Sequence, residues 1–259
     1  MLTSRLGPRA RHLIGRLLAS VGLATLLVVQ AVSSPPAEAQ TGSCVSPHCY
    51  SVGLWPGGNG PFGLGVFAGV GAVLRIPASS VTSPSSNFLV VADLWYLSSP
   101  NVNPGGFIEV GAIRGMLCCG GGTPTSAVRW FWGDLRPGSS YFAHFINYAS
   151  PGDSAYVQID NTAPNTFTIT GGGFVVGTSY IMPCCGSRLD VGSETYNAGG
   201  GGGVGSLSAT HADNLTFKSL GGTWAAWNAS YAGYITQNVN NPPYGVGAWF
   251  PAGNWIYGY

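Results

Sequence analysis

Charged residues are scarce in this sequence. Only 7% of the 259 residues are Asp, Glu, Lys or Arg, and four of the ten basic residues lie within the first 16 positions. Residues 40–259 hold six basic and eight acidic side chains, a formal charge of −2. No basic patch remains there, so the composition excludes nucleic-acid binding and offers nothing to attract an anionic membrane surface.

Helix signals are also missing. Gly, Ser, Thr, Asn and aromatic residues dominate, and no convincing amphipathic helix occurs after residue 40. Short alternating or β-branched runs, separated by Gly, Pro and Asn, are typical of an all-β sandwich or of a barrel. The expected strands are 65–77, 87–98, 106–115, 127–136, 140–148, 154–160, 166–171, 188–197, 214–220 and 223–228.

The first 39 residues are typical of a signal peptide. A basic lead-in precedes the apolar stretch 17–32, and the small residues Ala37 and Ala39 predict cleavage before Gln40. The apolar stretch is too short, and too closely followed by Pro and Ser, to favour a membrane span; an uncleaved anchor is the alternative. We expect a secreted, extracellular protein without a membrane contact after cleavage.

The remaining chain is expected to divide into three segments. Residues 40–84 form an N-terminal extension with a small disulfide loop and the first strands, and residues 85–230 form the β-sandwich domain. Residues 231–259 form an aromatic C-terminal extension, which adds strands, covers a sheet or binds a surface. The sequence does not indicate an oligomeric state.

All six cysteines follow the predicted cleavage site. An even number in an exported chain favours disulfides over metal ligands. A small loop closed by the first two cysteines is expected, with a metal site that includes His48 as the alternative; no His-rich metal spacing occurs, so no metal and no cofactor is expected. The six are Cys44, Cys49, Cys118, Cys119, Cys184 and Cys185.

Two glutamates mirror each other around the paired cysteines. Glu109 precedes Cys118 by nine residues, Cys185 precedes Glu194 by nine, and no other glutamate follows residue 39. If the two strands were antiparallel neighbours with their cysteines at one end, both carboxyls would lie at the same height, within interaction range, and the cysteines could cross-link. Close carboxyls ionise at different pH values and supply an acid and a base. The alternative is that both lie on solvated faces and the spacing is coincidental.

Three tryptophans lie near the first glutamate in the sequence. Trp130 and Trp132 share one face of their strand, which usually means core packing but also suits a groove for peptide or sugar. We expect Trp95, Trp130 and Trp132 to line a substrate groove beside catalytic Glu109 and Glu194. No Gly-x-Ser-x-Gly motif occurs, and nothing singles out a Ser/His/Asp triad.

The order of several short motifs resembles the glutamic peptidases of the eqolisin type. The motifs are "LWYLSSPNVNPGGFIEVGAI", "RWFWGDLRPG", "SPGDSAYVQID", "NTFTIT" and "LDVGSETYN", within about residues 85–220. The resemblance implies an antiparallel β-sandwich of the concanavalin-like, jelly-roll kind with a catalytic pair on one curved sheet. It places Glu194 at the family's catalytic Glu and Glu109 where eqolisins have Gln. The related neprosin-type peptidases resemble this two-glutamate arrangement. The Trp that follows the catalytic Glu in eqolisins is absent here.

Three functions follow from these observations. The first is an acid-acting endopeptidase, in which ionised Glu194 activates water and protonated Glu109 stabilises the oxyanion. The second is a non-catalytic secreted surface or carbohydrate-binding protein, which the low charge and the missing Trp fit. The third is a glycoside hydrolase that uses the same two carboxyls. The expected partner is accordingly a polypeptide or a polysaccharide.

Overall fold

The computed structural model describes residues 47–56, 67–97, 106–117, 122–180, 185–186, 188–200, 204–208, 210–227, 236–239, 246–249 and 254–257. The chain separates into two units between Pro36 and Ala37, and every described residue belongs to the second unit. The regular elements of this part are all strands. Within it, no helix is long and apolar enough to cross a membrane.

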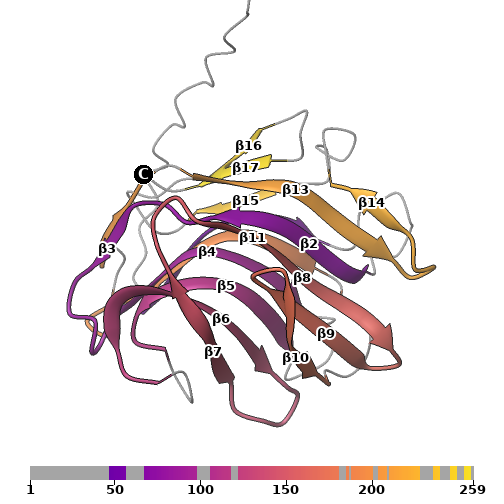
Figure 1. The fold of residues 1–259 in the computed structure, drawn as a ribbon, viewed down its shortest axis with the longest axis horizontal. Coiled ribbons are helices and arrows are strands. Elements are labelled where there is room, and N and C mark those ends of the chain that lie inside the picture. The colour runs from indigo at the N-terminus through magenta and orange to yellow at the C-terminus, as the bar shows by residue number, and fades with distance from the viewer. Residues whose placement is uncertain are drawn as a thin grey trace, which may run out of the picture. The chain divides into compact units, whose positions relative to one another are not determined.

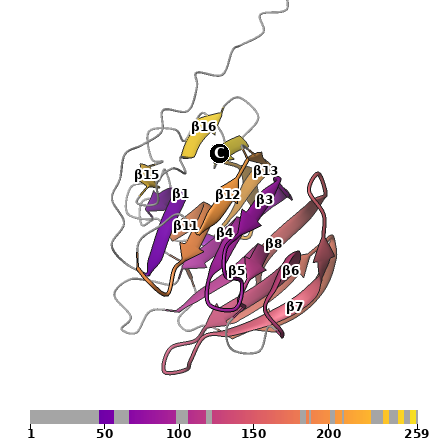
Figure 2. The same cartoon turned by 90° about the vertical axis from the view of Figure 1, so that its left-hand side faces the viewer.

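The first sheet has seven antiparallel strands in the order β15-β1-β11-β4-β5-β6-β7 (Figures 1 and 2). Its central strands are nearly continuous in buried residues, because the side chains of one face pack against the second sheet and those of the other face form a smaller buried cluster. The strands are β1 (His48–Pro56), β4 (Phe88–Leu97), β5 (Phe107–Gly115), β6 (Thr125–Leu135), β7 (Phe142–Ala149), β11 (Arg188–Tyr196) and β15 (Thr236–Val239).

The second sheet has eight strands in the order β10-β9-β8-β2-β13-β17-β16, with β14 paired to β13 (Figure 1). These strands are β2 (Phe67–Arg75), β8 (Ser154–Ala163), β9 (Thr166–Gly171), β10 (Phe174–Ser179), β13 (Thr210–Ser219), β14 (Trp224–Ala226), β16 (Val246–Trp249) and β17 (Asn254–Tyr257). Two short strands, β3 (Ser79–Val81) and β12 (Gly205–Leu207), pair with each other.

The main core lies between the two sheets. Val110 and Leu94 of the first sheet pack in one buried cluster with Val157 and Ile159 of the second, and all four side chains are inaccessible to solvent. Alternation along each strand directs every second side chain into this layer. The prediction of an all-β antiparallel sandwich is therefore confirmed.

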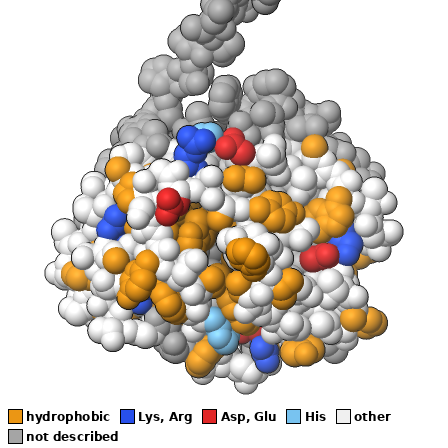
Figure 3. Space-filling view, in the orientation of Figure 1, with side chains coloured by type: hydrophobic (Ala, Val, Ile, Leu, Met, Phe, Trp, Pro, Cys, Tyr) orange, Lys and Arg blue, Asp and Glu red, His pale blue; other side chains and the backbone are white. Residues whose placement is uncertain are grey.

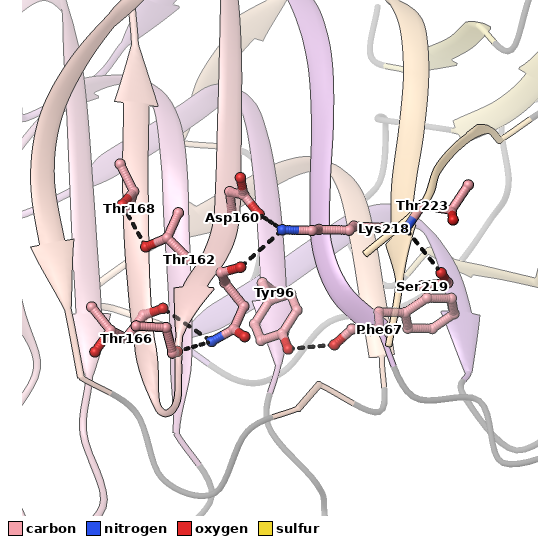
Figure 4. A network of polar contacts seen from close by, with 11 residues as sticks. Phe67, Tyr96, Asp160, Thr162, Thr166, Thr168, Lys218, Ser219 and Thr223 are labelled. Atoms are coloured by element: carbon pink, nitrogen blue, oxygen red, sulfur yellow. Dashed lines mark hydrogen bonds and ion pairs between the residues drawn. The ribbon is translucent and has the colours of Figure 1, made fainter. Parts of the chain in front are cut away.

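A buried tyrosine ties the sheets together near the end of β2. The Tyr96 hydroxyl, from β4, donates to the Phe67 carbonyl oxygen at 2.5 Å (Figure 4). The same hydroxyl oxygen accepts the Gly186 N–H. A Cβ on Gly186 would come within 2.6 Å of the tyrosine ring, so only glycine leaves room for this contact. In the second sheet, Lys218 of β13 reaches past β2 to Asp160 of β8, with a 2.6 Å ion pair.

Charged side chains stay sparse on the folded surface. The face in Figure 3 shows only a few basic and acidic groups, some of them side by side, among apolar and uncharged ones. Several charges that the structure describes are paired, as in the Arg136–Asp134 contact at 2.7 Å. The sparse surface charge agrees with the low proportion of charged residues in the sequence.

The segments at both ends contribute to the same two sheets as the middle of the chain. β1 and β2, from residues 40–84, are inner strands of the first and second sheets. From residues 231–259, β15 extends the first sheet, and β16 and β17 extend the second (Figure 1). Strand addition is thus the role that the described part of the aromatic tail adopts. β1, β3, β10 and β12 were not among the strands expected from sequence.

Candidate active site

A cavity of about 780 Å³ opens on the face of the first sheet that points away from the second sheet. Strands β1, β4, β5, β6 and β11 all contribute side chains to its lining. This volume falls in the range of ordinary ligand sites, and aromatic and aliphatic groups form most of the wall. We call this outer face of the first sheet the pocket face.

A β-bulge in β4 arranges the floor of the pocket. The register to both neighbouring strands shifts between Val90 and Asp93, so that Val91 and Ala92 both pack in the core between the sheets. The residues on either side of this bulge, Val90 and Trp95, then lie on the pocket face. Bulges commonly re-aim side chains beside active sites, and here one directs Asp93 and Trp95 to the same face.

Glu109 lies on β5 at the pocket floor, with only 5% of the residue exposed. Its Oε2 accepts the indole N–H of Trp95 at 2.7 Å, and its Oε1 accepts the Tyr141 hydroxyl at 2.5 Å. Gly133, opposite Glu109 on β6, makes room for this tyrosine, because a Cβ there would come within 2.3 Å of its hydroxyl oxygen. Burial raises the pKa of Glu109 to about 7, against the lowering effect of the hydrogen bonds.

Glu194 lies on β11 in the same pocket and is held from β1. Its Oε1 is 2.5 Å from Nδ1 of His48, a half-exposed imidazole that packs against Phe88 and Tyr196. The hydrogen bond to Glu194, rather than burial, controls this imidazole and raises the pKa of His48. The Tyr50 hydroxyl is also within hydrogen-bond reach of Glu194, and burial followed by the charge of Glu194 raises the pKa of Tyr50.

The two glutamates are not on neighbouring strands, contrary to the sequence prediction. β4 lies between β5 and β11, so the two glutamate strands run parallel to each other. They are also not at the same height, because Glu109 is level with Trp95, and Glu194 is level with Val90. The structure nevertheless brings both into one pocket, and the charge of Glu194 raises the pKa of Glu109.

Asp93 lies on β4, the strand that separates the two glutamate strands, at a height between Glu109 and Glu194. It pairs with Gly111, two residues beyond Glu109, and with Gly192, two residues before Glu194. Asp93 is completely buried, and burial followed by the charge of Glu109 raises its pKa well above the ordinary value. Sequence reasoning missed this residue; the available signal was a lone acid within the apolar run of residues 87–98.

A second acid–base contact lines the pocket near Trp95. Asp190 of β11 is level with Trp95 and is held by Arg188, whose Nε donates at 2.7 Å. Burial raises the pKa of Asp190, although its bonds to Arg188 act in the opposite direction. This end of the pocket therefore holds a paired acid and base, and the other titratable groups of the site are the two glutamates, Asp93 and His48.

No protein-family model and no curated protein matches this chain. Two solved structures of scytalido-glutamic peptidase, with a peptide-based transition-state analogue and with a transition-state-analogue inhibitor, align with 83% of this chain and 99% of theirs. Their identities are 11% and 12%, and their TM-scores are 0.48 and 0.49. SCP-B, a member of the eqolisin family solved with the tripeptide Ala-Ile-His, aligns over the same shares with 12% identity and a TM-score of 0.44. No residue role carries over at this identity, so function has to be inferred from the pocket.

The three predicted groove tryptophans separate in the structure. Trp95 lines the pocket beside Glu109, whereas Trp130 and Trp132 lie in the core between the sheets. A Cβ on Gly177 of β10, in the second sheet, would come within 2.3 Å of the Trp132 ring. Alternation in β6 sends Phe131 to the pocket and its two neighbours inward, so the groove prediction was wrong for Trp130 and Trp132.

Two of the six cysteines lie in the described part of the chain. Cys49, on β1, and Cys185 are disulfide-bonded. The other four, Cys44, Cys118, Cys119 and Cys184, fall outside the described residues, so the predicted loop and cross-link stay predictions. Within the described ranges, no group of three or more His, Cys, Asp or Glu side chains could hold a metal ion.

Proposed function

We propose that the protein hydrolyses peptide bonds at acidic to neutral pH, with Glu194 as the general base and protonated Glu109 as the acid. The main observation in support is that one pocket holds two glutamates in opposite electrostatic settings. Glu109 is buried and its pKa is raised to about 7, whereas Glu194 is ion-paired with His48. Such a difference lets one carboxyl hold a proton while the other is charged.

The environment of Glu109 indicates which oxygen carries the proton. The Trp95 indole N–H can only donate, so Oε2 has to accept and the proton belongs on Oε1. The partner of Oε1 is the Tyr141 hydroxyl, which can donate or accept. Oε1 and Tyr141 together form an acidic hydrogen-bond donor at the pocket floor.

The reaction then follows from these positions. Glu194 takes a proton from water as the water oxygen bonds to the carbonyl carbon of the substrate, and protonated Glu109 donates to the developing oxyanion. When the C–N bond breaks, the proton on Glu194 passes to the leaving amine. The products are a carboxylic acid and an amine, and Glu109 keeps its proton throughout as the hydrogen-bond donor to the oxyanion.

Wild-type protein should cleave a denatured polypeptide below neutral pH and lose activity as the pH rises through about 7. Above that value Glu109 is ionised, and a carboxylate repels the oxyanion instead of stabilising it. The measurement is kcat/KM between pH 3 and pH 9 on an unfolded protein, with product termini determined by mass spectrometry. Asp160→Asn, in the second sheet, is the matched control and should follow the wild-type profile.

A polysaccharide panel tested in parallel separates the alternatives. Reducing sugar released without peptide cleavage would replace the proposal with a glycoside hydrolase. Binding of a polysaccharide without any cleavage would support the non-catalytic carbohydrate-binding protein. An increase in peptidase activity above pH 7 would contradict the assignment of Glu109 as the acid.

We further propose that the chain is exported and that residues 1–39 are removed. The basic and apolar leader and the small residues before Gln40 support this, as do the disulfide-bonded Cys49 and Cys185, since disulfides persist in oxidising compartments. Terminal sequencing of protein recovered from the medium should give Gln40 as the first residue. Protein that stays with the membrane fraction and keeps its leader would instead support the uncleaved anchor.

A further inference from the structure

Asp93 occupies a position that a carboxyl group can tolerate only with a specific partner. Its side chain is fully buried on β4, between the strands that carry Glu109 and Glu194. Gly111 leaves room for it, because a Cβ at that position would come within 2.6 Å of Asp93 Oδ1. An isolated ionised carboxyl in such a place is strongly unfavourable, so the group has to be neutral or paired.

The hydrogen bonds of Asp93 account for only one of its oxygens. Oδ1 accepts the Leu94 backbone N–H at 2.7 Å, while Oδ2 has no donor among the described residues. The carboxyl of Glu109 is the side-chain group within hydrogen-bond reach of the Asp93 carboxyl. Two ionised carboxylates have no proton to bond through, so this contact requires that one of the two acids is protonated.

The donors around each acid indicate which one keeps the proton longer. Glu109 accepts from both Trp95 and Tyr141, and these donors stabilise its anion. Asp93 receives only one backbone N–H and is the more deeply buried of the two. The negative charge of the pair therefore belongs on Glu109, and the last proton belongs on Asp93.

We propose that Asp93 is a positioning residue that stays protonated and donates its proton in a hydrogen bond to Glu109. This bond holds the Glu109 carboxyl in place and sets the pH at which Glu109 ionises. The pair then carries at most one negative charge at neutral pH. The regulation of catalysis rests on the proposed function, but the shared proton does not.

The other titratable groups that face Asp93 fit this arrangement. Glu194 approaches from β11, and its negative charge also disfavours ionisation of Asp93. Tyr141, which precedes β7, is neutral because burial and the charge of Glu109 raise its pKa well above the ordinary value. Among the described residues, no basic side chain acts to lower the pKa of Asp93.

The experiment measures the ionisation of Glu109 directly, because Glu109 and Glu194 are the only glutamates in residues 40–259. Protein labelled with ¹³C at the glutamate carboxyl should give two side-chain signals, assigned with Glu194→Gln. Asp93→Asn retains an N–H donor at Oδ2, so the Glu109 transition should stay within about half a pH unit of wild type. Asp93→Leu removes the donor, so the transition should rise by about one unit or more.

The same variants distinguish the competing explanations. If Asp93 were charged, both variants would lower the Glu109 transition, and the proposal would fail. If Asp93 had only a structural role, neither Asp93→Asn nor Asp93→Leu would shift the pH of the Glu109 transition. Should Asp93→Leu not fold, aspartate-labelled wild type decides: the Asp93 signal, assigned by its loss in Asp93→Asn, should keep its protonated position from pH 4 to 8, and ionisation below pH 6 would overturn the proposal.

Activity measurements separate this inference from the proposed function. If both are right, the alkaline limb of kcat/KM moves with the Glu109 transition in each variant. If the carboxyl signals shift as expected and no peptide is cleaved, the shared proton stands and the peptidase proposal fails. If the alkaline limb of kcat/KM shifted in a variant whose Glu109 carboxyl transition did not, the limb would report the ionisation of another group. That result would contradict the role of Asp93.

Discussion

Replacing Glu194 by Gln should lower kcat on a peptide substrate by about 10²–10⁴-fold, the range expected for loss of a general base. The amide is close in size to the carboxyl, but it cannot take a proton from water. KM should change little, because the shape of the pocket wall is retained. The measurement is steady-state cleavage of an unfolded substrate at pH 5, beside Asp160→Asn, which should keep wild-type activity.

The His48 contact provides an independent readout of the same substitution. The hydrogen bond to Glu194 is the largest cause of the raised pKa of His48, so Glu194→Gln should return the His48 pKa toward its ordinary value. Imidazole signals followed by NMR would show this whether or not the protein is an enzyme. Wild-type turnover in a variant whose His48 has shifted would remove Glu194 from the mechanism.

The strands of this fold could be predicted from sequence, while their order could not. Alternation and turn residues predicted strands at 106–115 and 188–197, and the structure has β5 at Phe107–Gly115 and β11 at Arg188–Tyr196. The mirror spacing of the cysteines suggested that these two are neighbours. β4 lies between them, because sheet order depends on long-range pairing that no local pattern encodes.

The missed strands had weak local signals. β1 (His48–Pro56) begins beside a cysteine, contains a glycine and ends in a proline, so its composition suggested a loop. β10 (Phe174–Ser179) is an edge strand with exposed Phe174 and Val175, so the alternation of buried and exposed residues is poor there. Their places in the sheets come from pairing with β11 and β9.

The candidate site shows a similar division between what sequence could and could not predict. The scarcity of glutamate drew attention to Glu109 and Glu194, and both line the pocket. Asp93 escaped notice because an acid inside an apolar run gives no indication of which face it takes. Its direction depends on the bulge at Val91, which shifts the register of β4 against both neighbours.

The mirrored positions of Glu109 and Glu194 in the sequence correspond to a symmetric arrangement in the structure. The arrangement is centred on Asp93 and is not the predicted pair of neighbouring strands. In "FIEVG" the glutamate precedes a glycine by two residues, and in "VGSE" it follows one by two. Both glycines pair with Asp93, so the two glutamates extend in opposite directions from a common centre. A third acid at that centre provides the link that direct contact between neighbouring strands was expected to give.

Replacing Glu109 by Gln should make the protein more stable at pH 8 than wild type and flatten its pH dependence. The pKa of Glu109 is raised from 4.5 to about 7 in the folded chain. Between these values the native state holds a proton that the unfolded chain has released, so wild-type stability falls as pH rises. The loss is complete above pH 7 and amounts to roughly 3 kcal/mol. The amide of Gln does not ionise in this pH range, so the variant does not lose this stability as the pH rises.

The contacts of Glu109 indicate that the amide can be accommodated and can still act. Its oxygen would accept from Trp95, and its NH₂ group would face Tyr141, whose hydroxyl can turn to accept. The variant should therefore retain an oxyanion donor and remain active above pH 7, where wild type does not. Urea unfolding at pH 4 and pH 8 measures the stability difference, which should be small at pH 4. If the variant gained nothing at pH 8, or gained equally at both pH values, Glu109 would not be the buried acid on which this mechanism depends.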